Sequence, residues 1–331
     1  MSIPSDPTAG PALPASAAPK RRASFFAKDR PWINIVLFVL TLGSAFLVGA
    51  SWGANYLYGD KISSDLDFQL SLGTVFRDAR LIGLSLIYAV VLMAILLAHE
   101  MGHYLTCRKY GLSATLPFFV PAPTLIGTLG AFIKIRSPIT RKRELFDIGA
   151  AGPLAGFLLA VPALVVGLAL SRTIPSVTRD SIAFGEPLIF TLVGRLFIRH
   201  AGLGMTILFH PVAFAGWVGM LVTSLNLIPL GQLDGGHIFY AVFGSRSRAA
   251  TKIVMGLLAV AGVLFWAGWL IWFFILLIMG LRHPRVFDED APLGKRRTII
   301  AVLIVGIFIL SFIPAPVQGY NIVELVKSIL P

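Results

Sequence analysis

A strongly apolar run over residues 81–98 leads directly into the sequence His-Glu-Met-Gly-His at residues 99–103. Such a run, extended to residue 105, is long enough to cross the hydrocarbon core of a bilayer as a helix, which takes about 20 residues. In lipid every backbone polar group needs a partner within the segment, so a single spanning run of this kind has to be helical. The sequence therefore predicts a membrane helix that carries two histidines and a glutamate.

The composition indicates several such helices. Of the 331 residues, 56% are hydrophobic and 13% are charged, with a mean hydropathy of +0.82. A soluble domain has about 25% charged residues. We therefore predict an all-α polytopic membrane protein with about six transmembrane segments. The apolar runs behind this count cover residues 32–53, 81–105, 146–170, 205–227, 253–281 and 298–312.

One of these runs is ambiguous. Residues 253–281 are long for one span and short for two. Basic residues flank the run on both sides, which places both flanking loops on the cytoplasmic side of the membrane. This favours a short hairpin bent near Ala267 and Gly268, and a single tilted helix is the alternative.

The N-terminal segment differs from the rest of the chain. Residues 1–30 are rich in Pro, Ala and Ser and carry five basic residues between positions 20 and 30. This composition predicts a disordered basic tail on the cytoplasmic side. Residues 31–331 then form a single integral membrane domain, and residues 81–243 are its core.

The net charge of +12 raises the question of a nucleic-acid partner. The basic residues are dispersed among short loops between apolar runs, which is the distribution that orients membrane helices, and no nucleic-acid recognition motif accompanies them. We therefore expect the lipid bilayer as a partner and no nucleic acid. The single cysteine, Cys107, excludes an internal disulfide and a cysteine-rich zinc cluster, and we interpret it as an apolar filler.

The His-Glu-x-x-His sequence carries a specific chemistry. Histidines four residues apart lie on one face of a helix, and this pattern is the zinc-binding half of a metalloprotease site in which the glutamate is the general base. A charged side chain in a membrane helix costs about 2.5–3.5 kcal/mol on insertion scales, so Glu100 is expected to have a function. We predict His99 and His103 as metal ligands. Arg108 and Lys109 follow, so the site should lie near the cytoplasmic side.

The segment after this helix is of another kind. Residues 112–137 contain three prolines and two glycines among apolar and β-branched residues, which predicts short strands in a β-hairpin or re-entrant loop. Non-helical backbone at membrane depth has to be buried in protein or face a watery cavity, so the segment should pack beside the site. Its exposed edge could pair with an unwound substrate strand, or the segment could be a structural plug.

A second motif, at residues 226–237, reads Asn-Leu-Ile-Pro-Leu-Gly-Gln-Leu-Asp-Gly-Gly-His and follows another predicted span at its cytoplasmic end. Asp234 is the candidate third ligand, because two histidines and one carboxylate leave a fourth position open for water. Glu144 is the alternative carboxylate, but it follows three basic residues and is typical of a solvated loop. His237 is either a neighbour of the ligands or a helix-terminus residue.

Together these motifs resemble the site-2 protease family of intramembrane zinc proteases. The resemblance rests on residues 99–103, on the small-residue segment 149–156, and on Asn226-x-x-Pro229 followed by Leu-Asp-Gly at residues 233–235. The proline-rich residues 117–130 resemble the bacterial and chloroplast branch, which lacks a PDZ domain. The resemblance implies one zinc ion per chain held by His99, His103 and Asp234, with Glu100 as general base and Asn226 stabilising the oxyanion.

The resemblance also implies a substrate and a location. The substrate would be a transmembrane segment of another protein, which must unwind before cleavage because a helix hides its carbonyls in internal hydrogen bonds. The expected location is a bacterial cytoplasmic membrane. Two rivals stay open: a prenyl-protein type of zinc protease, with Glu144 as third ligand, and a non-proteolytic metal-binding or transport protein. Transport would predict polar residues repeated through several spans.

Overall fold

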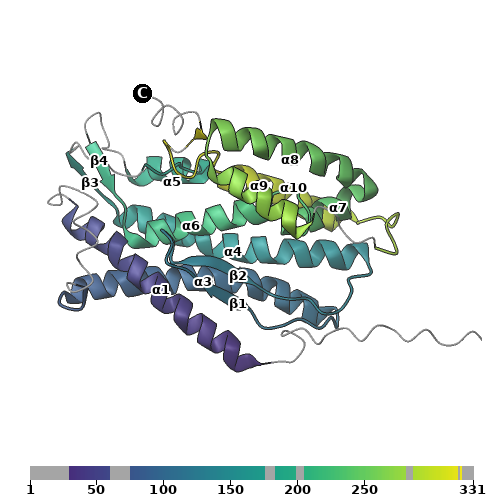
Figure 1. The fold of residues 1–331 in the computed structure, drawn as a ribbon, viewed down its shortest axis with the longest axis horizontal. Helices are drawn as coiled ribbons and strands as arrows, with labels where there is room; N and C mark the ends of the chain where they lie inside the picture. Colours follow the sequence, from purple (N-terminus) through teal and green to yellow (C-terminus); the bar gives the residue numbers. More distant parts are fainter. Residues whose placement is uncertain are drawn as a thin grey trace, which may run out of the picture. The chain divides into compact units, whose positions relative to one another are not determined.

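Long apolar helices dominate the structure, a computed structural model that describes residues 30–59, 75–175, 183–198, 205–280, 286–319 and 321–322 (Figure 1). Within this part of the chain, four segments have the length and hydropathy to cross a membrane: α1 (Pro31–Tyr58), α3 (Ala79–Lys109), α4 (Lys142–Leu170) and the segment Asp234–Leu264. The predicted polytopic helical class agrees with this finding. The tail predicted for residues 1–30 lies outside the described residues, apart from Arg30.

Shorter elements complete the fold. The remaining helices are α5 (Leu188–Phe197), α6 (Pro211–Asn226), α7 (Asp234–Phe243), α8 (Ser247–Leu264), α9 (Gly268–Met279) and α10 (Lys295–Ser311). Two antiparallel pairs of strands occur: β1 (Phe118–Pro121) with β2 (Thr128–Phe132), and β3 (Arg172–Pro175) with β4 (Met205–Leu208). Because α6, α9 and α10 are shorter than a typical span, the predicted number of six crossings does not follow from helix length alone.

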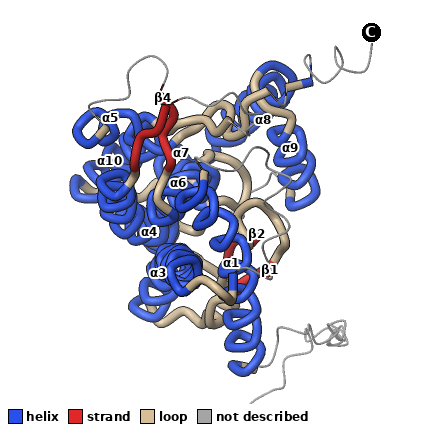
Figure 2. Tube along the Cα trace, turned by 90° about the vertical axis from the view of Figure 1, so that its left-hand side faces the viewer, coloured by secondary structure: helices blue, strands red, loops and turns tan. Residues whose placement is uncertain are grey.

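Three helices form the centre of the protein. Helices α3, α4 and α6 pack against one another in all three pairs, and Figure 2 shows α3 nearly end-on beside its neighbours. Helix α6 is the innermost, with fourteen of its 16 residues buried, as expected of a helix that is apolar on every side. Helix α1 packs against α3 on the other side. The motif-bearing helix α3 is therefore covered by protein on several faces.

The β1–β2 hairpin lies against α1 and close to α3 (Figure 1). Helix side chains donate hydrogen bonds to backbone carbonyls of the hairpin segment. Asn34 donates to Leu116 and Pro117 at 3.0 and 2.8 Å, and Ser44 donates to Ala122 at 3.0 Å. Carbonyls at membrane depth need such donors because no water is available there. Side chains of the spanning helices therefore satisfy backbone carbonyls that this non-helical segment would otherwise leave without a donor.

The apolar run at residues 253–281 is divided between two helices. Helix α8 ends at Leu264, residues 265–267 are not helical, and α9 begins at Gly268. The two helices pack against each other. The alternative of a single tilted helix is therefore wrong, and the break lies at the position predicted for a bend.

A strap, which we define as residues 286–294, crosses between α4 and α7. The Phe287 N–H donates to the Thr140 carbonyl at 2.9 Å, and the Lys142 N–H at the start of α4 donates to the Asp288 carboxylate at 2.6 Å. The next residue, Glu289, accepts from the Ser245 N–H at 2.5 Å, just beyond α7. The strap thereby connects the beginning of one central helix with the end of the helix that starts at Asp234.

Candidate metal centre

Helix α3 presents the two histidines of the motif on one face. His99 and His103 are both buried, with 3% and 6% of their surface exposed. Their ring centroids lie 5.0 Å apart, and their Nε2 atoms are 3.2 Å apart. The helical spacing therefore places both ring nitrogens at one point in the protein interior, as predicted.

Asp234 reaches the same point from a different part of the chain. It is the first residue of α7, reached by the turn that follows α6. Its Oδ2 atom lies 3.1 Å from His99 Nε2 and 3.2 Å from His103 Nε2. Among the described residues, His99, His103 and Asp234 form a group whose ligand atoms all lie within 4.8 Å of one another.

The distances within this group fit a zinc ion. Ligand atoms at about 2.0–2.1 Å from a tetrahedral zinc are separated from one another by about 3.3 Å. The three separations here are 3.1, 3.2 and 3.2 Å. Two imidazole nitrogens and one carboxylate oxygen are also ligands that zinc prefers. The residues present can therefore hold this metal with little rearrangement, and three ligands leave the fourth position open.

The backbone of α4 orients one of the histidines. The His103 Nδ1–H donates to the Ile148 carbonyl at 2.8 Å, within a buried contact. This bond fixes the tautomer, so Nε2 carries its lone pair toward His99 and Asp234. A backbone carbonyl has no signature in the sequence, and sequence reasoning did not identify Ile148.

Small residues of α4 let it approach the ligands. A methyl group on Gly152 would lie 2.0 Å from His103 Nε2, and one on Gly156 would lie 3.1 Å from His99 Nδ1. On α3, a methyl group on Gly102 would lie 2.4 Å from the Ala151 carbonyl oxygen. The small-residue segment 149–156 therefore forms one wall of the centre in addition to packing two helices closely.

Glu100 lies beside the histidines and faces the hairpin. Its side chain is buried, with 6% of the residue exposed. Its carboxylate lies close to the backbone N–H of Ile133, the residue after β2. The glutamate of the motif is thus between the metal-binding group and the β1–β2 hairpin.

Asn226 also reaches the centre. It is the last residue of α6, and its side-chain nitrogen lies 3.3 Å from His99 Nε2. The alternative considered from the sequence was that this amide ties the backbone of its own span to neighbouring segments. In the structure this amide contacts a histidine of the predicted metal group.

The other candidate residues lie elsewhere. Glu144 is in the first turn of α4, 3.9 Å from Arg141, and is not part of the three-residue group. Cys107 is buried in α3. His237 packs near α4, because a methyl group on Gly149 would lie 3.0 Å from its Cβ.

Comparisons with known proteins point in the same direction. The model of peptidase family M50 matches residues 87–268. The chain is 30% identical over 299 residues to the probable zinc metalloprotease EGY1, chloroplastic, of Arabidopsis thaliana, which covers 85% of this chain and 53% of that protein. It is 29% identical over 260 residues to EGY2 of the same plant, covering 75% of this chain and 45% of that protein. No solved structure matches.

These relatives also set limits. The chain spans about half the length of the curated relatives it matches. They are chloroplast proteins by name, so they give no support to the bacterial cytoplasmic membrane expected from the sequence, and only the integral membrane character is retained. The family model covers more than half of the chain and all five predicted site residues. This chain belongs to peptidase family M50, the family of the site-2 proteases.

Proposed function

We propose that this protein is an intramembrane zinc metalloprotease that hydrolyses peptide bonds within or near transmembrane segments of other membrane proteins. The observation that carries the proposal is the convergence of His99, His103 and Asp234, with ligand atoms 3.1–3.2 Å apart, beside a buried glutamate in an apolar helix. Family membership and the names of the relatives support it.

In this proposal His99, His103 and Asp234 hold one zinc ion. A zinc ion at this position supplies Lewis acidity toward water and toward a peptide carbonyl. The Ile148 carbonyl keeps His103 in the tautomer that a ligand needs. The wall formed by Gly152 and Gly156 excludes other side chains from this side of the ligands.

Glu100 is the general base. Its carboxylate takes a proton from the attacking water and passes it to the nitrogen of the leaving amine, so the same group serves both halves of the hydrolysis. Its neighbour in α3 is a ligand histidine, which keeps the carboxylate within one residue of the metal group. Burial keeps bulk water away from this proton transfer.

Asn226 is proposed to stabilise the oxyanion. Its amide nitrogen lies 3.3 Å from His99 Nε2, and it is therefore at the edge of the metal group. A fixed amide donor aimed at the developing negative charge would lower the barrier to attack.

Substrate binding is proposed to use the hairpin. In the described part of the chain β2 pairs with β1 alone, and β1 packs against α1. The residue after β2 contacts Glu100. An unwound substrate strand that pairs with the outer edge of β2 would thus present its carbonyls beside the general base.

The orientation of the site follows from the loop charges. His103 lies six residues before the end of α3 at Lys109, or about 9 Å along the helix axis. The predicted loops at that end are basic, so we place the site near the cytoplasmic side of its membrane. The partners in this proposal are transmembrane protein substrates and lipid, with no nucleic acid.

The decisive experiment compares the purified wild type with Glu100→Gln, after reconstitution with a panel of single-span membrane proteins. The wild type should cleave at least one of them, a zinc chelator should stop the cleavage, and Glu100→Gln should bind zinc without cleaving. Glu144→Gln is the matched control, and it should retain both zinc and activity.

Two results would count against the proposal. Loss of zinc in Glu144→Gln would favour the protease type with a third glutamate ligand. Equal, chelator-resistant turnover in the wild type and Glu100→Gln would remove the proteolytic assignment and favour a metal-binding or transport protein.

A further inference from the structure

A cluster of three polar side chains lies where α3, α4 and α10 come together. The Asp147 carboxylate accepts two hydrogen bonds from the Arg297 guanidinium, from Nε and from Nη2, both at 2.7 Å. It also accepts a hydrogen bond from the Tyr110 hydroxyl. Asp147 and Arg297 are about one quarter exposed. We call Tyr110, Asp147 and Arg297 the clamp.

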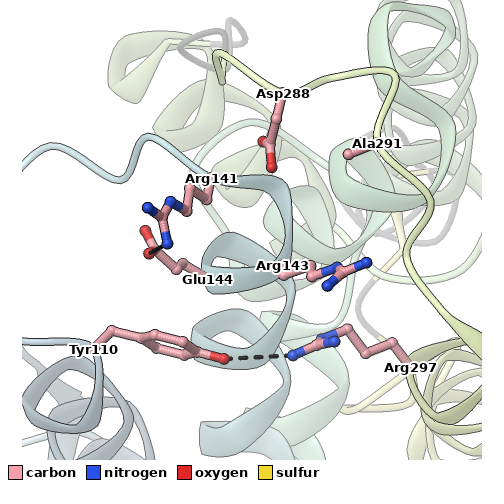
Figure 3. Close-up of a pocket in the computed structure, with 7 residues that line it drawn as sticks. All are labelled: Tyr110, Arg141, Arg143, Glu144, Asp288, Ala291 and Arg297. Carbon is pink, nitrogen blue, oxygen red and sulfur yellow. Dashed lines mark hydrogen bonds and ion pairs between the residues drawn. The ribbon is translucent and has the colours of Figure 1, made fainter.

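Two residues of the clamp, Tyr110 and Arg297, line an open cavity of about 510 Å³ near the C-terminal end of α3. Figure 3 shows Tyr110 and Arg297 on opposite sides of the start of α4, joined by a contact of 3.5 Å. The Tyr110 side chain follows the end of α3, and its pKa is raised by burial and by the neighbouring Asp147 carboxylate.

The charges in this cavity are already compensated from within the protein. Arg141 lies 3.9 Å from Glu144, and Arg143, which donates to the Pro292 carbonyl at 3.3 and 3.2 Å, shares the cavity wall with the Asp288 carboxylate. Arg297 is paired with Asp147. The cavity therefore does not offer an unbalanced positive charge to an anionic ligand, and the cluster has the character of an internal brace.

The clamp is connected to the metal centre through the backbone of α4. Asp147 directly precedes Ile148, whose carbonyl accepts the hydrogen bond from His103 Nδ1. Tyr110 lies seven residues after His103, about two turns along α3 and its cap. Holding Tyr110 and Asp147 together therefore fixes the two segments whose separation determines the bond between His103 and Ile148.

We propose that Tyr110, Asp147 and Arg297 are positioning residues that hold the Ile148 carbonyl against His103 and so set the affinity of the centre for zinc. Partners of a metal-bound histidine typically change metal affinity about 10- to 100-fold when they are removed, because they fix the ring orientation and tautomer. The clamp acts one step further out, so a smaller effect is expected. This inference rests on the metal site of the proposed function.

The experiment measures zinc affinity of the full chain in detergent by competition with a chromogenic chelator. Asp147→Asn and Arg297→Lys should weaken zinc binding about fivefold or more, since lysine cannot form the paired hydrogen bonds of the guanidinium. Tyr110→Phe removes one hydroxyl and should weaken it about twofold. If Asp147→Asn does not fold, the effect of the clamp on zinc affinity can still be measured with this milder variant.

The control uses the ion pair at the opposite end of the same helix. Arg80 and Asp78 lie 3.4 Å apart at the start of α3, and Asp78→Asn should leave zinc affinity equal to that of the wild type. Equal zinc affinity in the wild type, Arg297→Lys and Tyr110→Phe would overturn the clamp. If the wild type itself does not bind zinc, the proposed metal site is wrong. This result differs from one in which the wild type binds zinc and the clamp variants bind it equally well, which would contradict the clamp alone.

Discussion

Gly152 lies where a single methyl group would collide with a ligand of the proposed zinc ion. Alanine favours a helix over glycine by about 1 kcal/mol, so a substitution here should not by itself unfold α4. The methyl group would stand 2.0 Å from His103 Nε2, an atom that has to face the metal. At this position helix propensity favours alanine, whereas metal binding requires glycine.

We therefore expect Gly152→Ala to lower zinc affinity by about tenfold or more, and the collision with the buried His103 ring should also cost about 1–3 kcal/mol of stability. The measurement is zinc content per chain after purification, together with the melting temperature. Gly83→Ala in α3 is the control, because nothing lies within 4 Å of the added methyl group. One tightly bound zinc per chain in Gly152→Ala would show that the wall of small residues does not define the centre.

The site shows how far residue-level prediction reaches. The spacing of His99 and His103 follows from helical geometry alone, and this part of the centre could be read from the sequence. Ile148 could not be, because it contributes a backbone carbonyl and its side chain carries no clue to that role. Asn226 was named from a motif, and its contact with His99 became visible only after α6 was packed against α3.

At the scale of elements, α3 is the central scaffold of the protein. It has 31 residues, which corresponds to about 46 Å, longer than a hydrocarbon core of about 30 Å. Its first turn is capped by Asp78, which accepts from the Arg80 N–H at 2.9 Å. The Tyr58 hydroxyl at the end of α1 donates to the same carboxylate. The cap thus connects the first two spanning helices.

This cap should make stability depend on pH. The hydrogen bond from Tyr58 is the largest cause that lowers the pKa of Asp78, to about 2, with the Arg80 N–H next. In the unfolded chain the pKa is about 3.9. Because the folded state holds its proton less tightly, this stabilisation is present above about pH 4 and is lost as the pH falls toward 2.

The measurement is the melting temperature in detergent between pH 6 and pH 2. Asp78→Asn should melt below the wild type at pH 6, and the difference should shrink as the pH approaches 2. Tyr58→Phe should show the same trend with a smaller difference, since the Arg80 N–H remains. Parallel curves for the wild type and Asp78→Asn would exclude a contribution of the cap.

Some elements could be predicted from the sequence and others could not, for physical reasons. Proline and glycine exclude a helix locally, so the non-helical character of residues 112–137 could be read directly. How β1 is held could not, because the donors Asn34 and Ser44 lie about 80 residues away in α1. The strap could not be predicted from the sequence, because its hydrogen-bond partners, residues 140–142 and residue 245, lie far from it along the chain.

At the scale of the whole molecule, the two ends of α3 should face opposite sides of the membrane. Arg77 precedes the helix at one end, and the strap with Asp290 lies near α4 and the clamp at the other. Both residues are exposed. The basic loops predict that the strap is on the cytoplasmic side.

Because Cys107 is the only cysteine and is buried, single cysteines can be introduced and labelled cleanly. In a Cys107→Ala background, Asp290→Cys should react with an impermeant maleimide from the cytoplasmic side, and Arg77→Cys should react from the opposite side. Labelling of both positions from one side would contradict the arrangement. The reverse pattern would move the proposed site to the other face of the membrane.

The sequence by itself determined the class of this protein, and it predicted the helical half of the proposed metal site and the orientation expected from the loop charges. These properties depend on local quantities: hydropathy along the chain, the period of a helix, and the charge of short segments. The tertiary structure decided which carboxylate stands beside the histidines, and it placed Asp234 there and Glu144 at a separate cavity. It also decided which backbone and glycine positions surround the ligands. These contacts depend on how α3, α4, α6 and α7 pack in three dimensions, and residues 135 positions apart meet only through that packing.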